Sequence, residues 1–369
     1  VTDTVRKGIV DPVGFAATPE LLVLGMLSAL LACAIWVHVA TLWGMPVSTT
    51  HSIVGAVAGF GIVAMGWSSV QWGTMGEIVL SWVISPVAGC VLAFCIFKLI
   101  SWFILGRNRP VKAAERFAPF FVFYVVVVVS SSILVRGLDQ FFKKQHIEMT
   151  DGKAFMISSA LGILFAVLSR FFIRRYLRGT EQKSLSEQLQ SVEKIFAPLV
   201  IATSCSVAFA HGANDVANAI GPVAAVADIA MTGTINMKVS VPFWVLSLGG
   251  LGIIVGLATY GYRVLATIGT KITQLTPSRG VAADLATATT VLICSRMKLP
   301  VSTTHTIVGA IIGIGFARGL GAVNQKVIRE IFSSWFITVP AAAALSMIFF
   351  SVGRWLRVDL WIRQVFPAM

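Results

Sequence analysis

The segment PVSTTHSIVGA at residues 46–56 recurs as PVSTTHTIVGA at residues 300–310, an offset of 254 residues. Ten of the eleven positions are identical, and the same register continues from Pro86 to Pro340. A match this long within one chain indicates that a structural unit has been duplicated. Duplicated halves are common in secondary membrane transporters.

The composition places the chain in a membrane. Of its 369 residues, 56% are hydrophobic and 12% are charged, and the mean hydropathy is +0.85. Soluble domains carry about a quarter charged residues, so a soluble globule, a disordered chain and a disulfide-stapled secreted fold are excluded. Apolar runs of about 18 or more residues recur, each long enough to cross a hydrocarbon core of ~30 Å. We therefore predict an all-α, polytopic membrane protein.

About ten spans are expected from these apolar runs. They lie at residues 20–42, 49–67, 76–105, 117–136, 154–174, 196–232, 241–266, 280–298, 303–319 and 328–353. The segment 196–232 is too long for one straight crossing and is polar in its middle, so we expect a broken helix or a re-entrant pair there. If it makes one net crossing, an odd number of spans separates the two motifs and the repeats are inverted. If it is a full hairpin, the repeats are parallel; we favour the inverted arrangement.

The basic residues are concentrated in the loops between the predicted spans. The formal net charge is +13, from 29 Lys and Arg against 16 Asp and Glu. Basic residues concentrate at 106–116 and 170–194, which lie on one side of the membrane because two spans separate them. Short basic loops stay in the cytoplasm, so these loops are predicted to be cytoplasmic and the membrane to be the plasma (inner) membrane. The charge therefore requires no nucleic-acid partner.

A polar motif, GANDVANAIGP, lies at residues 212–222 in the middle of an apolar stretch. An ionisable residue such as Asp215 is costly there unless it faces a partner or a wet cavity. Asn214 and Asn218 are four residues apart and share one face of a helix. The glycines and Pro222 would allow the helix to break and free backbone groups for ion binding. The alternative is a buried polar cluster that only holds helices together.

Each PVSTTH motif predicts the start of a helix. Proline is tolerated in the first turn and hydroxyl residues cap it, so the first N–H groups point outward with the positive end of the helix dipole. Two such termini facing each other would bind a tetrahedral oxyanion without a basic side chain. Ordinary helix capping is the alternative. For His51 and His305 three roles stay open: donating to the anion, moving a proton, or bracing the loop, which we favour.

Other residues give weaker signals. Asp284 lies within a predicted span, where it is either a cation ligand or a neutral, hydrogen-bonded acid. The five cysteines are interpreted as buried small apolar residues. No hydrolase, metalloprotease or P-loop motif is present, and the loops are too short for a nucleotide-binding domain, so we predict neither an enzyme nor a cofactor.

GANDVANAIGP together with the two PVSTTH motifs resembles the inorganic phosphate transporter family of the PiT type. The resemblance implies a cation-coupled phosphate symporter with about twelve spans, inverted repeats and, in several members, a homodimer. It implies that phosphate is bound by Ser48, Thr49, Thr50, Asn214, Asp215, Asn218, Ser302, Thr303 and Thr304. It further implies that the cation is bound by Asp215, Asn218 and Asp284.

The family carries a GAND-like motif in each half, and this chain has one. Subtracting the 254-residue offset from Asp215 gives a position about 39 residues before residue 1. We therefore expect an absent N-terminal segment of about two spans. The rest divides into the remainder of the first repeat (1–105), connecting spans with a polar cytoplasmic linker (106–195), and the second repeat (196–369).

The function expected from the sequence is sodium-coupled import of inorganic phosphate through a site between the repeats. Proton coupling is the alternative for the cation, although the motifs are closer to the sodium-coupled branch of the family. Alternatives for the activity are a sulfate permease on the same scaffold and a passive anion channel. Phosphate, sodium and the lipid bilayer are the expected partners.

Overall fold

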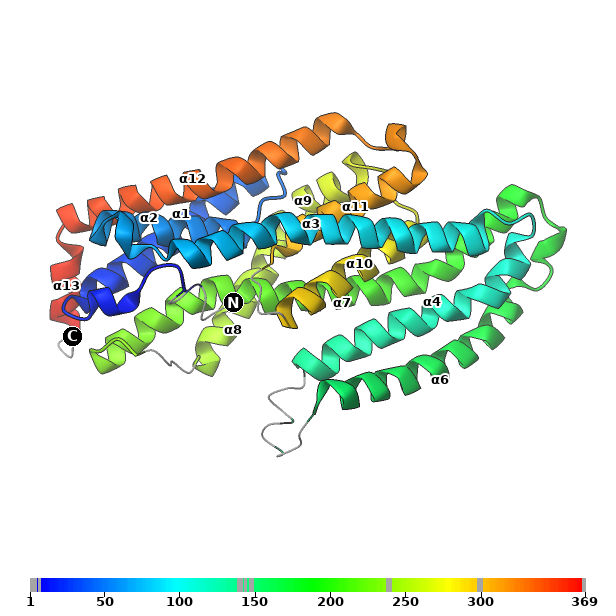
Figure 1. Cartoon of the computed structure of the whole chain (residues 1–369), viewed down its shortest axis with the longest axis horizontal. Coiled ribbons are helices and arrows are strands. Elements are labelled where there is room, and N and C mark those ends of the chain that lie inside the picture. Colours follow the sequence, from blue (N-terminus) through cyan, green and yellow to red (C-terminus); the bar gives the residue numbers. More distant parts are fainter. Residues whose placement is uncertain are drawn as a thin grey trace.

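The computed structural model is helical along nearly all of its described length (Figure 1). The structure describes residues 5, 8–137, 142, 145, 149–236, 241–296 and 301–366. Within these ranges, the one isolated β-bridge joins Val10 to Val70. The all-α prediction is confirmed for the part of the chain that is described.

Each of the ten predicted segments corresponds to a helix or a helical run. The bounds are α1 Pro19–Leu42, α2 Thr49–Met65, α3 Trp72–Ile100, α4 Pro110–Ser132, α6 Asp151–Leu177, α7 Leu185–Thr232, α8 Phe243–Gly256, α9 Tyr262–Ala266, α10 Pro277–Arg296, α11 Thr303–Arg318, α12 Gln325–Trp355 and α13 Val358–Val365. Short π-helical turns continue α3 and α4 and join α8 to α9. Pro300, which opens the second motif, lies outside the described residues.

Seven helical runs in the described chain are long and apolar enough to cross a membrane. They are α1, α3, α4, α6, α7, α8–α9 and α12 with their π-helical extensions. Helices α2 and α11 have 17 and 16 residues, which corresponds to about 26 and 24 Å, so each is shorter than a ~30 Å hydrocarbon core. A helix of this length that starts at a polar motif can place its N-terminus inside the membrane.

Helix α7 corrects the expectation of a broken helix or re-entrant pair at 196–232. It is a single α-helix of 48 residues that includes both Pro198 and Pro222. A capping box between Ser184 and Glu187 starts it, and Gly233 in the left-handed conformation ends it. A proline removes one helical hydrogen bond, whereas a full break inside a membrane would leave several backbone groups without partners, so the continuous helix has the lower free energy.

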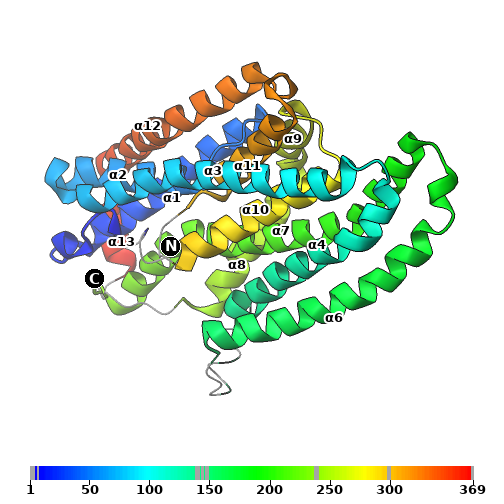
Figure 2. The same cartoon turned by 45° about the vertical axis from the view of Figure 1, so that its right-hand side comes forward.

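The two motif helices pack reciprocally. Helix α2 lies against α12, and α11 lies against α3, and Figures 1 and 2 both show these pairs side by side. The contacts are at glycines: a Cβ added at Gly55 would lie 2.5 Å from the carbonyl oxygen of Val339. In the second pair, a Cβ at Gly309 would overlap the backbone of Pro86. Glycine at these positions therefore allows each motif helix to pack closely against its neighbour.

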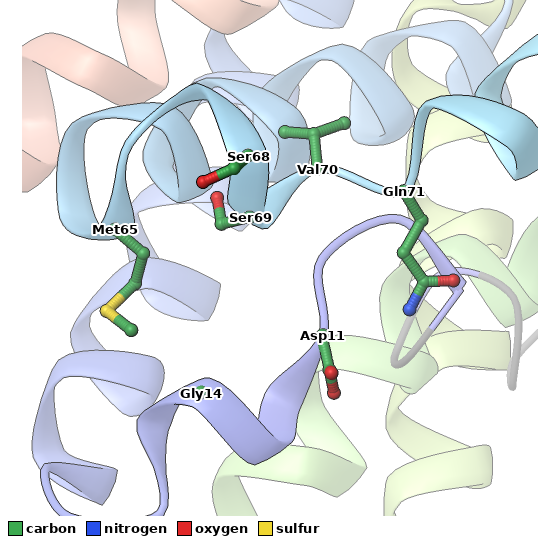
Figure 3. A pocket seen from close by; sticks show the side chains of 7 residues that line it. All are labelled: Asp11, Gly14, Met65, Ser68, Ser69, Val70 and Gln71. Atoms are coloured by element: carbon green, nitrogen blue, oxygen red, sulfur yellow. The ribbon is translucent and has the colours of Figure 1, made fainter.

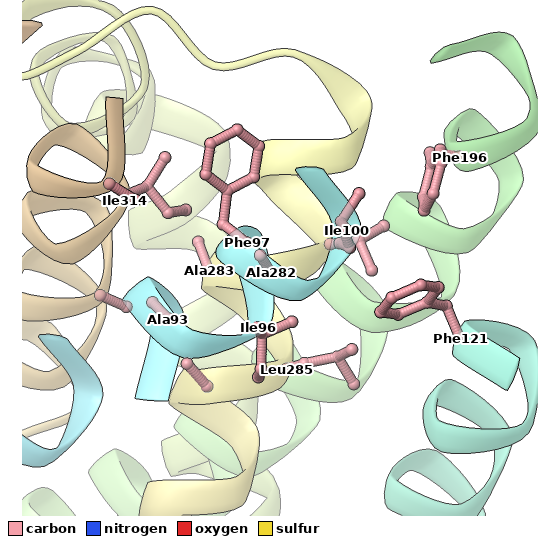
Figure 4. Close-up of a cluster of buried hydrophobic side chains, with 14 of the residues drawn as sticks. Ala93, Ile96, Phe97, Ile100, Phe121, Phe196, Ala282, Ala283, Leu285 and Ile314 are labelled. Carbon is pink, nitrogen blue, oxygen red and sulfur yellow. The ribbon is translucent and has the colours of Figure 1, made fainter. Parts of the chain in front are cut away.

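Buried apolar side chains form two large clusters, one that includes residues of α3 and α11 and one that includes residues of α2 and α12. Figure 4 shows part of the first, where Ile100 of α3 lies toward Phe121 of α4 and Phe196 of α7. Phe97, also of α3, lies on the other side of its helix, toward Ile314 of α11. The second cluster joins the N-terminal residues, α1, α2 and parts of α12 and α13. A third, small cluster of Ala210, Val291, Cys294 and Val301 lies next to the polar part of α7.

The outer faces of several helices are apolar and exposed. In the most apolar window of α8–α9 only 6% of residues are buried, and in that of α6 only 17%.

The prediction that all five cysteines are buried is wrong in part. Cys294 is buried, Cys33 and Cys90 are partly buried, and Cys95 and Cys205 are exposed. Lipid is as apolar as a protein core, so an apolar stretch in a membrane protein does not distinguish burial from lipid contact.

An open pocket lies at the C-terminal end of α2 (Figure 3). Its lining includes Asp11, Met65, Ser68, Ser69 and Gln71. Met65 is 16 residues after Thr49 on the same helix, or about 24 Å along the helix axis. The pocket is therefore remote from the PVSTTH motif at the start of α2.

Candidate functional site

The two motifs form nearly identical helix starts. Ser48 caps α2 in an extended conformation, and its hydroxyl oxygen accepts from the backbone N–H of His51 at 3.2 Å. Ser302 caps α11 in the same way and accepts from the N–H of His305 at 3.2 Å. Each serine thus satisfies one N–H of a first turn and orients the threonines that follow. The predicted capping is present in both copies.

Asp215 of α7 joins the two helix starts. Its Oδ2 accepts from Thr49 Oγ1 at 2.9 Å, and its Oδ1 accepts from Thr303 Oγ1 at 3.3 Å. Asn214 Nδ2 donates to Oδ1 at 3.0 Å, and His211 Nε2 lies 2.9 Å from Oδ2. One carboxylate therefore contacts both copies of the motif through different oxygens.

The asparagines of the GAND motif hold the same two turns. Asn218 Nδ2 donates to Thr49 Oγ1 at 3.1 Å and to Thr50 Oγ1 at 3.0 Å. Asn214 Nδ2 also donates to the carbonyl oxygen of Val301 at 3.2 Å. Both asparagines are nearly fully buried. The structure therefore brings the predicted residues of α7, α2 and α11 into one cluster.

One buried acceptor in this cluster has no hydrogen-bond partner. It is the amide oxygen Oδ1 of Asn218. The Asp215 carboxylate and the hydroxyls of Thr49 and Thr50 are the neighbouring oxygens. Carboxylate, amide and hydroxyl oxygens are the donor set that a hard cation prefers. The residues present therefore fit a cation at this place.

The sequence predicted no role for His211, which immediately precedes the GANDVANAIGP motif. Its side chain is about half exposed, whereas that of Asp215 is 10% exposed. The spacing of four residues on one helix was the signal that would have identified the pair. His211 extends the cluster from the buried carboxylate toward the protein exterior.

The rings of the two motif histidines contact aromatic side chains. The ring of His51 stacks on Trp82 with centroids 3.6 Å apart, and the ring of His305 stacks on Trp335 at 3.6 Å. The two histidine rings meet edge to face at 4.1 Å. Aromatic packing therefore surrounds both rings.

Asp284 is not brought into the Asp215 cluster. It lies on α10, and its Oδ2 accepts from Thr203 at 3.0 Å and from Ser204 at 2.6 Å. Ser204 precedes Asp215 by 11 residues on α7, which is about 16 Å along the helix. Asp284 therefore forms a second buried carboxylate group, about three turns away. Thr304, the remaining predicted residue, is 9% exposed in the first turns of α11.

Comparison with known proteins decides the family. The phosphate transporter family model matches residues 1–346. The chain belongs to the phosphate transporter family.

Several relatives resemble the chain over nearly all of its length. A "Putative phosphate permease" of Thermococcus kodakarensis is 45% identical over 355 residues, covering 95% of this chain and 83% of the relative. The chloroplastic inorganic phosphate transporter 2-1 of Arabidopsis thaliana is 40% identical, covering 95% of this chain and 62% of the relative. A solved structure, described as the sodium-dependent phosphate transporter, is 43% identical with a TM-score of 0.83 and covers 96% of this chain and 84% of that chain.

Membership in this family agrees with the helical runs described above. The family is one of transporters and not of enzymes. The chain is therefore a multi-pass membrane protein of a phosphate transport family, as predicted from its motifs.

Proposed function

We propose that this protein imports inorganic phosphate together with sodium, at a site formed by the first turns of α2 and α11. The observation that carries the proposal is that a single carboxylate, Asp215, accepts hydroxyl hydrogen bonds from Thr49 and Thr303. The two positive helix ends therefore converge on one point. Such a point suits an oxyanion.

Phosphate would be bound by dipoles. The hydroxyls of Ser48, Thr49 and Thr50 and their counterparts Ser302, Thr303 and Thr304 surround the two first turns. Helix N–H groups and hydroxyls replace the hydration shell of an anion without adding a fixed positive charge. A site of this kind can release its ligand after a conformational change, which a transporter requires.

A carboxylate beside a bound anion creates the need for a cation. At 4 Å two like charges repel by roughly 4 kcal/mol at an effective dielectric constant of 20. A sodium ion between Asp215 and phosphate would turn that repulsion into attraction. The partnerless Oδ1 of Asn218 supplies a further ligand. This charge argument supports obligatory coupling, and the sodium-dependent relative supports sodium as the ion.

Asp284 is proposed as a second cation ligand. Its carboxylate is 9% exposed and is bound by the hydroxyls of Thr203 and Ser204. Proton coupling is the alternative for this carboxylate. The two cases differ in whether its removal changes the sodium dependence or the pH dependence of uptake.

The membrane arrangement that we propose has about ten spans and inverted repeats. Because α7 is continuous, we count it as one crossing. Seven helical runs, an odd number, then lie between the start of α2 and the start of α11: α2, α3, α4, α6, α7, α8–α9 and α10. Rocking of one repeat against the other would expose the site to each side of the membrane in turn.

We propose that the protein lies in the plasma membrane with its basic loops in the cytoplasm. The proposed assembly is a homodimer.

The test is uptake of labelled phosphate into proteoliposomes with sodium, potassium or proton gradients imposed in turn. Accumulation above equilibrium with sodium alone supports the proposal. Equilibration without accumulation would indicate a passive anion channel. Stronger competition by unlabelled sulfate than by unlabelled phosphate would indicate a sulfate permease.

A further inference from the structure

Four aromatic rings form a continuous column between the two repeats. In order, they belong to Trp82 of α3, His51 of α2, His305 of α11 and Trp335 of α12. Successive ring centroids are 3.6, 4.1 and 3.6 Å apart. The outer pairs are stacked within 28° and 17° of parallel, and the central pair is edge to face at 70°.

The column is attached directly to the two helix starts. The backbone N–H of His51 is held by Ser48, and that of His305 by Ser302. Each histidine therefore belongs to the same turn as the threonine that contacts Asp215. The indole N–H of Trp335 donates to the carbonyl oxygen of Pro46 at 3.0 Å, which connects the column to the loop before α2.

We propose that this ring column sets the distance between the two helix starts, and thereby selects the oxyanion by size. His51, His305, Trp82 and Trp335 are positioning residues in this proposal and do not touch the ligand. The proposal rests on the proposed phosphate site and adds the origin of its selectivity.

The Asp215 side of the site cannot set this distance by itself. Thr49 and Thr303 use their hydroxyls on the Asp215 carboxylate, and the same hydroxyls are needed by phosphate when it binds. The contacts at Asp215 therefore rearrange during each transport cycle. None of the contacts to the Asp215 carboxylate described above involves a ring of the column, and flat rings with few rotatable bonds resist compression and shear. It holds the two turns in register while the ligands change.

If the ring column only fills space and does not set the distance between the helix starts, a different result is expected. In that case any side chain of similar volume would serve, and the affinity for phosphate would not depend on ring shape. Both histidines are nearly fully buried, at 3% and 2% exposure, so substitutions must be compared at similar volume.

The test compares His51→Phe with His51→Leu in proteoliposomes, using arsenate as a larger tetrahedral oxyanion. The Phe variant keeps a flat ring, and the Leu variant does not. We expect His51→Leu, which removes the ring that contacts both Trp82 and His305, to raise the KM for phosphate about three- to tenfold. We also expect it to reduce the preference for phosphate over arsenate, with a smaller change in maximal rate, while His51→Phe stays within about twofold of the wild type.

His38→Leu is the matched control, since His38 is exposed on α1 and outside the column. If His51→Leu does not fold, the pair Trp82→Phe and Trp82→Leu tests the same point one ring farther from the site. Equal KM values and equal arsenate preference for the Phe and Leu variants would overturn the proposal. Wild-type protein that neither binds nor accumulates phosphate would instead refute the proposed function, so the two failures are distinguishable.

Discussion

Thr49 and Thr303 are 254 residues apart in the sequence, yet their hydroxyls donate to the two oxygens of one carboxylate, at 2.9 and 3.3 Å. The two copies of the motif are therefore halves of one site. This relationship gives the site its symmetry and makes Asp215 of α7 its centre.

Replacement of Asp215 by asparagine should nearly abolish phosphate uptake while leaving the protein folded. The amide keeps the size of the side chain but removes the charge that a sodium ion would neutralise. Initial uptake rates in proteoliposomes and the elution profile of the purified protein measure the two effects. Asp228→Asn is the control on the same helix, because Asp228 bonds to Asn236 near the end of α7. Normal uptake by the Asp215 variant would remove this residue from the mechanism.

Replacement of Thr49 or Thr303 by valine should raise the KM for phosphate by about tenfold each, since each removes one hydroxyl at nearly constant volume. The double variant should show less than the product of the two effects, because both hydroxyls act on one carboxylate. Thr259→Val is the control, as its hydroxyl bonds within its own helical run. Independent, fully multiplicative effects would argue against a shared site.

Replacement of Asp284 by asparagine separates its two proposed roles. If Asp284 binds sodium, the sodium concentration for half-maximal uptake should rise by about tenfold or more, while uptake at saturating sodium is largely retained. Thr203→Val should produce a smaller shift in the same direction, because Thr203 orients the carboxylate. Unchanged sodium dependence with a shifted pH profile would assign Asp284 to a proton instead.

The close packing of the motif helices should be sensitive to a single methyl group. Gly309→Ala forces a Cβ into the backbone of Pro86 and should lower the free energy of unfolding by about 1–3 kcal/mol. Gly76→Ala, in α3, meets no atom within 4 Å and should be neutral or slightly stabilising. Thermal unfolding in detergent compares the two variants. An equal Tm for both would show that the α3–α11 contact tolerates expansion.

The sequence predicted the helices and the convergence of the motifs well, for physical reasons. Long apolar runs in a chain of this hydropathy have few alternatives to membrane helices. The capping chemistry of Ser48 and Ser302 is local, so it could be derived from the residues alone. The match between the two motif copies then led to the expectation that their helix starts would face each other.

Other features depended on contacts that the sequence does not encode locally. Gly212 and Pro222 predicted a break, but α7 runs through both residues as one continuous helix. Asp284 was grouped with Asp215 because both acids lie within apolar stretches, although Asp284 lies on α10 and contacts α7 about three turns away from Asp215. The stacking of His51 on Trp82 joins residues 31 positions apart on different helices and has no sequence signature.

The central claim is that the two helix starts and Asp215 bind phosphate and sodium together. Equilibrium binding of labelled phosphate to the purified protein, in sodium and in choline at equal ionic strength, measures this most directly. The account predicts saturable binding in sodium, little in choline, and loss of binding in Asp215→Asn. Equal affinity in sodium and choline, or full binding by the Asp215 variant, would contradict it.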